Sequence, residues 1–173
     1  MSTEKIFRSP IAAFEGFGKK PMMLEHRLHE SPLFDDEMLA HLIERSERRN
    51  YYVNTNDSTR HDTRTRREGE IRDLPGKDVI EAIRTGAIWV LLLKPEEIDQ
   101  RYGALVRDIY REISETVPGF SAYNEKLSIL VSSPNILVYY HCDIPGQSLW
   151  QVRGNKHVYV YPNREPFLQQ ERQ

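Results

Sequence analysis

The spacing of apolar residues changes at Gly119. Before that point, residues 95–117 repeat apolar side chains with a period of about 3.6, the period of one face of an α-helix. After it, residues 127–131 alternate apolar and polar side chains with a period of about two, as a half-buried strand does. Helices first and a sheet afterwards predict an α+β fold.

Two more helices and a buried strand are predicted before the long helix. Residues 36–49 carry apolar side chains on one helix face, and Asp35 or Asp36 is placed to cap the first turn. Residues 79–86 predict a short helix that ends at its glycine. The continuous apolar run at 87–93 has the length of a buried strand.

The C-terminal part of the chain predicts three further strands. The first covers residues 136–142. The next two, at 148–153 and 156–161, are separated by Gly154 and Asn155, a two-residue loop typical of a tight hairpin. This hairpin would place Arg153 opposite Lys156. At the end of the hairpin, the lysine side chain can point either into the mouth of a barrel or into water.

Composition narrows the class of protein. The chain has 173 residues, a net charge of -2 at pH 7, 39% hydrophobic and 29% charged residues, without the basic excess of a nucleic-acid binder. Its longest apolar run, at 87–93, is too short to cross a membrane. Charged residues among the first eight argue against a signal peptide, and the single cysteine excludes an internal disulfide. We therefore expect a soluble, cytoplasmic domain.

Two potential metal ligands stand at the end of the strand predicted over 136–142. His141 and Asp143 are two residues apart, so an extended backbone points both to one face. A neutral imidazole, a carboxylate and a second imidazole form the facial triad that leaves positions open on Fe(II) for a co-substrate and oxygen. Lys156 is a candidate for the cation that holds the co-substrate.

The run HCDIPGQSLWQVRGNKHVYVYP, residues 141–162, contains these groups in one order. It resembles the jumonji C and cupin-like branch of the Fe(II)- and 2-oxoglutarate-dependent dioxygenases, over about residues 133–162. The family motif is roughly His-x-Asp, a polar stretch, Gln-hydrophobic-x-Gly-x-Lys and an apolar strand. The resemblance implies that His141 and Asp143 bind Fe(II) and that Lys156 binds the distal carboxylate of 2-oxoglutarate.

Two further positions are assigned by the same resemblance. Gln147 stands where the family often has an asparagine that contacts the co-substrate, and it keeps the amide group. Val138 replaces a common threonine, so one hydroxyl contact is missing. Tyr139 or Tyr123 is a candidate to replace that hydroxyl.

The resemblance implies N-terminal helices packed on a double-stranded β-helix barrel of the jelly-roll, cupin-like type. Residues 1–120 would form the helical region, with a strand at about 87–93 contributing to the barrel, and residues 121–173 would form its first half. In the family a second histidine follows several strands after the lysine. Here His157 alone follows Lys156, and strand alternation turns it to the opposite face. We expect the chain to be a piece of a longer protein, or a truncated protein that does not use iron.

The cysteine, three aromatic residues and the remaining histidines each have two interpretations, one as part of the fold and one as part of a functional site. Cys142 is predicted to be a buried, inert thiol rather than a ligand. Trp150, Tyr159 and Tyr161 share one face of the predicted hairpin, where they either pack in the core or line a substrate pocket. The remaining histidines all precede the predicted sheet and are weak candidates for the third ligand: His26, His29, His41 and His61.

The stretch from Asn54 to Gly76 is poor in apolar residues and is predicted to be a long loop. It contains five arginines, offset by nearby acidic residues. A solvated loop is one interpretation. The other is an active-site lid in which Arg64 and Arg66 meet an anionic substrate.

Two functions from different classes follow from the sequence. The first is an Fe(II)- and 2-oxoglutarate-dependent oxygenase, of the hydroxylase or demethylase type, that acts on a protein or a small molecule. The second is a cupin-like binding or regulatory module that has lost the third metal ligand. An incomplete barrel has open strand edges, which predict a homodimer.

Overall fold

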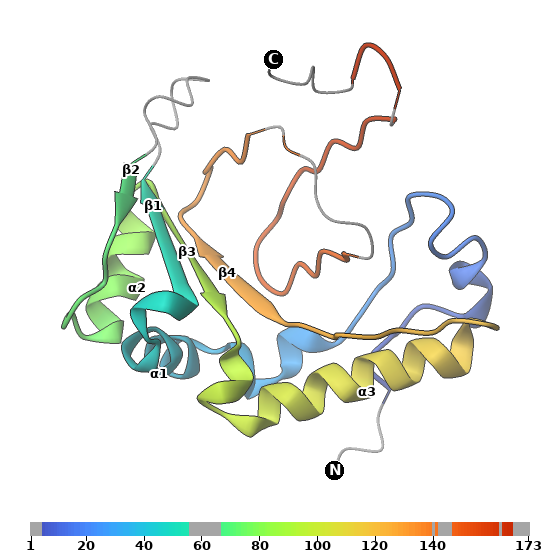
Figure 1. Ribbon diagram of the computed structural model, residues 1–173, viewed down its shortest axis with the longest axis horizontal. Helices are drawn as coiled ribbons and strands as arrows, with labels where there is room; N and C mark the ends of the chain where they lie inside the picture. The colour runs from blue at the N-terminus through green and yellow to red at the C-terminus, as the bar shows by residue number, and fades with distance from the viewer. Residues whose placement is uncertain (1–4, 56–66, 140, 142–146, 163, 168–173) are drawn as a thin grey trace.

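The computed structural model describes the following parts of the chain: residues 5–55, 67–139, 141, 147–162 and 164–167. They contain three α-helices and one four-stranded antiparallel sheet, with the strand order β2-β1-β3-β4. The α+β fold class is therefore confirmed. Figure 1 shows α1 and α2 beside the sheet at the left, and α3 along the bottom of the molecule. None of the described helices has the length and apolar character to cross a membrane.

The strands are Tyr51–Thr55 (β1), Arg67–Gly69 (β2), Ile88–Leu93 (β3) and Ser128–Ser132 (β4). The central strand β3 pairs with β1 on one side and with β4 on the other. β3 and β4 confirm the strands expected at 87–93 and 127–131. The prediction of one long loop from Asn54 to Gly76 is wrong at residues 54–55 and 67–69, because β1 and β2 pair there as an antiparallel ladder, and at Gly76, which begins a helix.

The helices are Asp36–Arg45 (α1), Gly76–Thr85 (α2) and Gln100–Thr116 (α3). They confirm the three helices that periodicity predicts, with shifted ends. α1 stops short of residue 49 because Ser46 adopts an extended backbone and its hydroxyl donates to the Leu42 carbonyl oxygen at 2.8 Å. Short 3₁₀ turns join the elements: η1 (Ile11–Phe14), η2 (Leu28–Glu30), η3 (Pro32–Phe34), η4 (Arg48–Asn50) and η6 (Pro95–Glu97).

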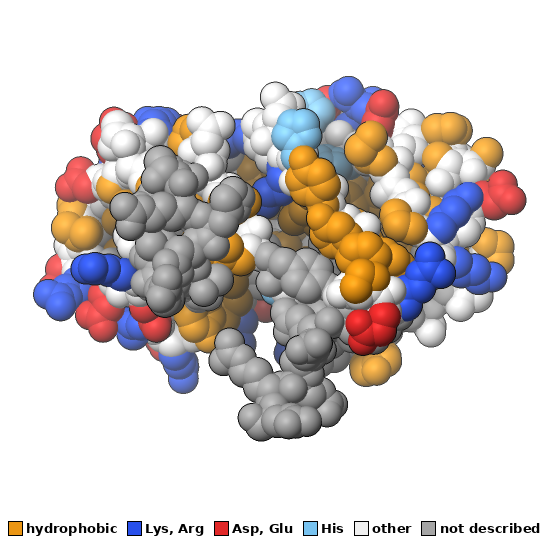
Figure 2. Space-filling view, turned by 90° about the horizontal axis from the view of Figure 1, so that it is seen from above, with side chains coloured by type: hydrophobic (Ala, Val, Ile, Leu, Met, Phe, Trp, Pro, Cys, Tyr) orange, Lys and Arg blue, Asp and Glu red, His pale blue; other side chains and the backbone are white. Residues whose placement is uncertain are grey.

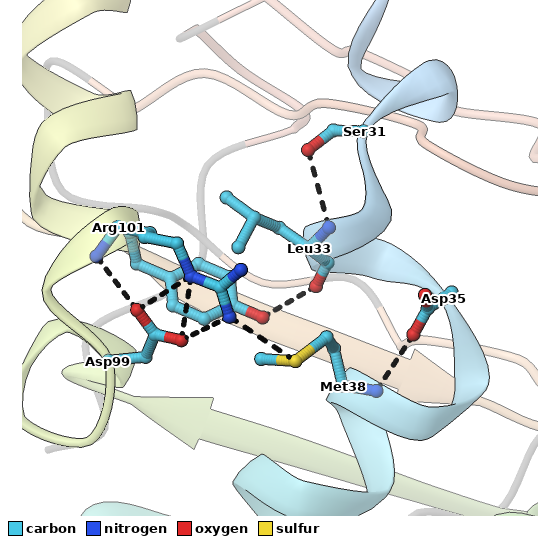
Figure 3. Close-up of polar contacts among 7 residues, drawn as sticks. Ser31, Leu33, Asp35, Met38, Asp99 and Arg101 are labelled. Atoms are coloured by element: carbon cyan, nitrogen blue, oxygen red, sulfur yellow. Dashed lines mark hydrogen bonds and ion pairs between the residues drawn. The ribbon is translucent and has the colours of Figure 1, made fainter. Parts of the chain in front are cut away.

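Side-chain caps fix where α1 and α3 begin. The Asp35 carboxylate accepts a hydrogen bond from the Met38 backbone N–H at 2.8 Å, and Asp99 accepts one from the Arg101 N–H at 2.9 Å. Figure 3 shows that both caps lie close together, where the start of α3 meets η3 and α1. At this junction the fully buried Tyr102 donates its hydroxyl to the Leu33 carbonyl oxygen at 2.5 Å, and burial raises the pKa of Tyr102.

α1 and α2 touch through their backbones. A Cβ atom added to Gly76, the first residue of α2, would lie 1.9 Å from the carbonyl oxygen of Ala40 in α1. Any residue larger than glycine would therefore push the two helices apart. Together they cover one part of a continuous core whose most buried large side chains include Leu42, Ile43, Val90, Leu92 and Tyr102.

The N-terminal segment, residues 5–30, is attached to α3 and to itself. Phe7 and His26 form an isolated antiparallel bridge. The carboxylate of Glu112, in α3, accepts hydrogen bonds from two successive backbone N–H groups, that of Ile6 at 2.7 Å and that of Phe7 at 3.1 Å. One side chain thus holds the start of the described chain against the helix.

The strands predicted after β4 are not formed in the part of the chain that the structure describes. Residues 136–139, 141 and 147–162 have no strand assignment, so the predicted hairpin at 148–153 and 156–161 is wrong there. The physical reason is that β-propensity alone does not make a strand, because a strand needs a hydrogen-bonding partner. The described sheet is open rather than barrel-shaped, and of the described residues in the predicted half barrel at 121–173, those of β4 alone belong to it.

Candidate functional site

The candidate ligand His141 is exposed and lies next to Tyr139 in space as well as in sequence. Its ring atom Nδ1 is 2.7 Å from the Tyr139 carbonyl oxygen. A carbonyl oxygen can only accept, so Nδ1 carries the proton and the neutral ring keeps its lone pair on Nε2. This is the ring arrangement that a metal ligand uses, with the other nitrogen bonded to the backbone. Asp143 and Cys142 lie outside the described residues.

The two residues expected to bind the co-substrate, Gln147 and Lys156, are both exposed. Lys156 follows Gly154, whose positive φ of 74° marks a turn, but the turn does not join paired strands. The described residues contain no group of three side chains that could hold a metal ion. Of the residues predicted to bind the metal or the co-substrate, the described structure brings Tyr139 and His141 into contact.

Trp150, a weak candidate for a substrate contact, packs against the N-terminal segment. Its ring centroid is 5.2 Å from that of Phe7 and 5.3 Å from that of His26. Its indole N–H donates to the Ser148 hydroxyl oxygen at 2.9 Å. Together with the partly buried Val152, it joins the main core. Trp150 therefore anchors residues 147–162, which we call the C-terminal segment.

The other two aromatic residues of the predicted hairpin face solvent. Tyr159 is 77% exposed, and the half-exposed Tyr161 stacks on Phe167 with ring centroids 5.2 Å apart. The prediction that Tyr159 packs in the core is therefore wrong, because no second sheet covers this side chain in the described structure. Figure 2 shows a row of hydrophobic side chains on the face of the molecule seen from above.

A second anchor of the C-terminal segment is an ionic contact to the first turn of α1. The Arg153 guanidinium donates to Asp36 Oδ1 at 2.8 Å, and Arg84 of α2 contacts the other oxygen of the same carboxylate. The hydrogen bond from Arg153, together with the charges of both arginines, lowers the pKa of Asp36. Sequence reasoning missed this triad because its members come from three distant parts of the chain.

His26 occupies a partly buried position between the N-terminal and C-terminal segments. Its Nδ1 atom accepts a hydrogen bond from the Leu28 backbone N–H at 3.2 Å. Burial and the neighbouring His29 lower the pKa of His26, while a hydrogen bond with the backbone of Gln151 opposes that shift. The sequence makes His26 a weak candidate for a third metal ligand. Its contact with Trp150 has no signal in the sequence, because the two residues are far apart along the chain.

An open surface hollow of about 820 Å³ lies beside β2. It is lined by Arg48 and residues 68–74. Arg48 forms ion pairs with Glu68 at 2.9 Å and with Glu70 at 3.6 Å, and the bond to Glu68 raises the pKa of Arg48. Four of its lining side chains, Arg48, Glu68, Glu70 and Arg72, thus form a network of ion pairs. Arg64 and Arg66, the candidate lid residues, lie outside the described residues.

The chain was compared with family models, curated proteins and solved structures, and none of them matches it.

Proposed function

We propose that this chain contributes to an Fe(II)- and 2-oxoglutarate-dependent oxygenase, of the hydroxylase or demethylase type. The observation that carries the proposal is the ordered run from His141 to Pro162, in which a His-x-Asp pair precedes a lysine and an apolar stretch. His141 and Asp143 would hold the metal. Lys156 would hold the distal carboxylate of the co-substrate, with Gln147 and Tyr139 as further contacts.

The hydrogen bond between His141 Nδ1 and the Tyr139 carbonyl oxygen supports this assignment. It fixes the ring as the tautomer that offers Nε2, and an imidazole with a carboxylate is the donor set that Fe(II) takes in such oxygenases. When bound, the iron and 2-oxoglutarate supply the oxidising chemistry. The residues of this chain would bind and orient those groups.

The proposal includes a jelly-roll barrel of the cupin type around this site. Among the described strands β4 lies at an edge of the sheet, so one of its sides is available to additional strands. A barrel removes such edges by closing the sheet on itself. The four-stranded sheet would then be one wall of that barrel.

The test is an anaerobic titration of the purified chain with Fe(II) and 2-oxoglutarate, followed by the visible charge-transfer absorption of the chelate. We expect the band in the unmodified chain and its loss in His141→Ala and Asp143→Ala. Lys156→Ala should retain Fe(II) binding but weaken the binding of 2-oxoglutarate. His157→Ala is the matched control and should behave as the unmodified chain. A band that survives in His141→Ala would overturn the assignment.

The second candidate is a cupin-like binding or regulatory module without catalysis. It is favoured by the exposure of Lys156 on a segment that forms no strand. A ligand that prefers the folded state must raise the melting temperature. This candidate therefore predicts no change in Tm with Fe(II) or Mn(II), and a rise in Tm that His141→Ala removes would contradict it.

A further inference from the structure

The end of the C-terminal segment is an exposed apolar stretch, residues 156–161, which we call the arm. Its four apolar side chains are between 48% and 77% exposed: Val158, Tyr159, Val160 and Tyr161. Single exposed apolar residues are common on soluble proteins, but a contiguous group of them marks a surface that binds something. The arm is therefore a candidate for an interaction surface.

The backbone of the arm is unpaired as well. Within the described part of the chain, residues 156–160 make no hydrogen bond with another backbone group. Valine and tyrosine are among the residues that favour strands most, and such a sequence becomes a strand when a partner strand is present. The arm is thus a strand in composition that lacks its partner.

The two edges of the described sheet differ as possible partners. β2 has three residues, two of them charged, and its Glu68 forms an ion pair with Arg48. Charged, short edges discourage the addition of a strand. β4 has five residues, Ser128–Ser132, and none of them is charged. An apolar strand is therefore accepted better by β4 than by β2.

The side chains of β4 also match those of the arm. Ile129 and Val131 belong to the core side of the sheet, whereas Leu130 lies on the other side and is 38% exposed. In a strand added at this edge, the two valines of the arm can extend the core side. Tyr159 then lies on the opposite side, beside Leu130, as an aromatic and aliphatic cross-strand pair.

A second copy of the chain offers the edge that the arm needs. Within one copy, β4 pairs only with β3 among the described strands. The residues just before the arm are held elsewhere, Trp150 against Phe7 and Arg153 against Asp36 of α1. Each copy carries one arm and one β4 edge. Two copies related by a two-fold axis can therefore exchange arms and close the assembly.

The surface involved is large enough for a dimer. An aromatic side chain buries about 150–250 Å², so the two tyrosines and two valines of one arm expose on the order of 400 Å². Two arms and the surfaces that they cover would bury at most on the order of 1,600 Å², and specific interfaces begin at about 1,000 Å².

We propose that residues 156–161 form a strand on the β4 edge of a second copy of the chain, in a two-fold dimer that exchanges its arms. Backbone pairing supplies the attachment, and alternate side chains fix the register. The homodimer expected from open strand edges thereby gains a defined interface. It requires neither iron nor 2-oxoglutarate, so it is independent of the proposed activity.

Sedimentation velocity of the full chain over a series of concentrations is the first test. We expect the mass to rise from monomer to dimer. Val160→Asp should raise the dissociation constant by about tenfold or more, because it puts a charge beside the apolar side of β4. Ile11→Asp is the matched control, since Ile11 is 70% exposed and Val160 is 68% exposed, and it should leave the constant unchanged. A chain that stays monomeric, or a dimer that Val160→Asp does not weaken, would overturn the proposal.

Cross-linking between chains identifies the acceptor. Both chains carry Cys142→Ala, which removes the single cysteine. One then carries Tyr159→Cys and the other Leu130→Cys, at positions that are both exposed. A short bis-maleimide reagent should join the two chains when they are mixed.

Two other patterns of cross-linking contradict the arm exchange. Products formed only between two Tyr159→Cys chains would mean that arms pair with arms. Products formed only within a chain that carries both cysteines would mean that the arm pairs with its own β4. Either pattern overturns the proposal.

Discussion

The helix and sheet region, residues 36–132, and the C-terminal segment, residues 147–162, differ in what holds their backbones. The first is held by helix hydrogen bonds, by strand ladders and by buried apolar side chains. The second is held by a few side-chain contacts, namely those of Trp150, Val152 and Arg153. In this protein, therefore, β-branched and aromatic residues form regular structure where a partner strand is present.

Matched truncations in the two regions should give the largest contrast. Leu92 in β3 is 0% exposed, whereas Val160 in the C-terminal segment is 68% exposed. Leu92→Ala should lower the free energy of unfolding by about 2–5 kcal/mol, because it leaves a cavity. Val160→Ala should change it by less than about 0.5 kcal/mol. Urea denaturation measures both, and equal losses would refute the contrast.

A single methyl group added at the contact between α1 and α2 should destabilise the protein. Gly76→Ala places a Cβ against the Ala40 carbonyl oxygen and should cost about 1–3 kcal/mol of stability through overpacking. Gly103→Ala is the matched control inside α3, where the nearest atom to the new Cβ is 3.4 Å away. It should be neutral or stabilise by up to about 1 kcal/mol, because alanine favours a helix. Thermal denaturation distinguishes the two.

The hydrogen bond of Tyr102 tests the junction of α3 with the start of α1. Tyr102→Phe keeps the buried ring but leaves the Leu33 carbonyl oxygen without this donor, which should cost about 1 kcal/mol. Tyr159→Phe, at an exposed ring of the C-terminal segment, should change stability by less than about 0.5 kcal/mol. Chemical denaturation of both variants is the measurement, and a Tyr102→Phe protein as stable as the parent would show that water replaces the bond.

The ion pair of Arg153 should have the smallest effect on global stability, below about 1 kcal/mol, because both partners are partly exposed. Its effect should appear instead as stronger acrylamide quenching of the Trp150 fluorescence in Arg153→Ala, measured in a Trp89→Phe background because the chain has two tryptophans. The pKa of Asp36 is lowered from 3.8, so this anchor is present above that pH and is lost as the pH falls through the folded pKa. Asp36→Asn should remove that acid step.

Apolar periodicity predicted those helices and strands whose apolar faces pack against a partner in the folded protein. The three helices, β3 and β4 follow from apolar spacing and from residues such as Asp35, which caps α1 as expected. β2 was not predicted, because Arg67–Gly69 has no apolar pattern and its pairing depends on β1. β1 was missed although Tyr51, Tyr52 and Val53 favour a strand.

The candidate site was predicted from the order of its residues along the chain rather than from apolar periodicity. Of its members, the structure relates Tyr139 to His141, while Gln147 and Lys156 stay exposed. The contacts of His26 with Trp150 and of Asp36 with Arg153 could not be predicted, since each joins residues that are far apart in the sequence. Such contacts have no periodic signature, and only the folded backbone brings them together.

The central position of β3 has a consequence for how the chain folds during synthesis. Val90 pairs with Val53, which is made well before it, and with Val131, which is made well after it. Sheets built from such distant pairings form slowly, because long loops must close first. Until Val131 has left the ribosome, the apolar strand β3 has one open edge, which is the kind of surface that chaperones bind. A translational pause before β4 would therefore prolong exposure of the most hydrophobic stretch of the protein.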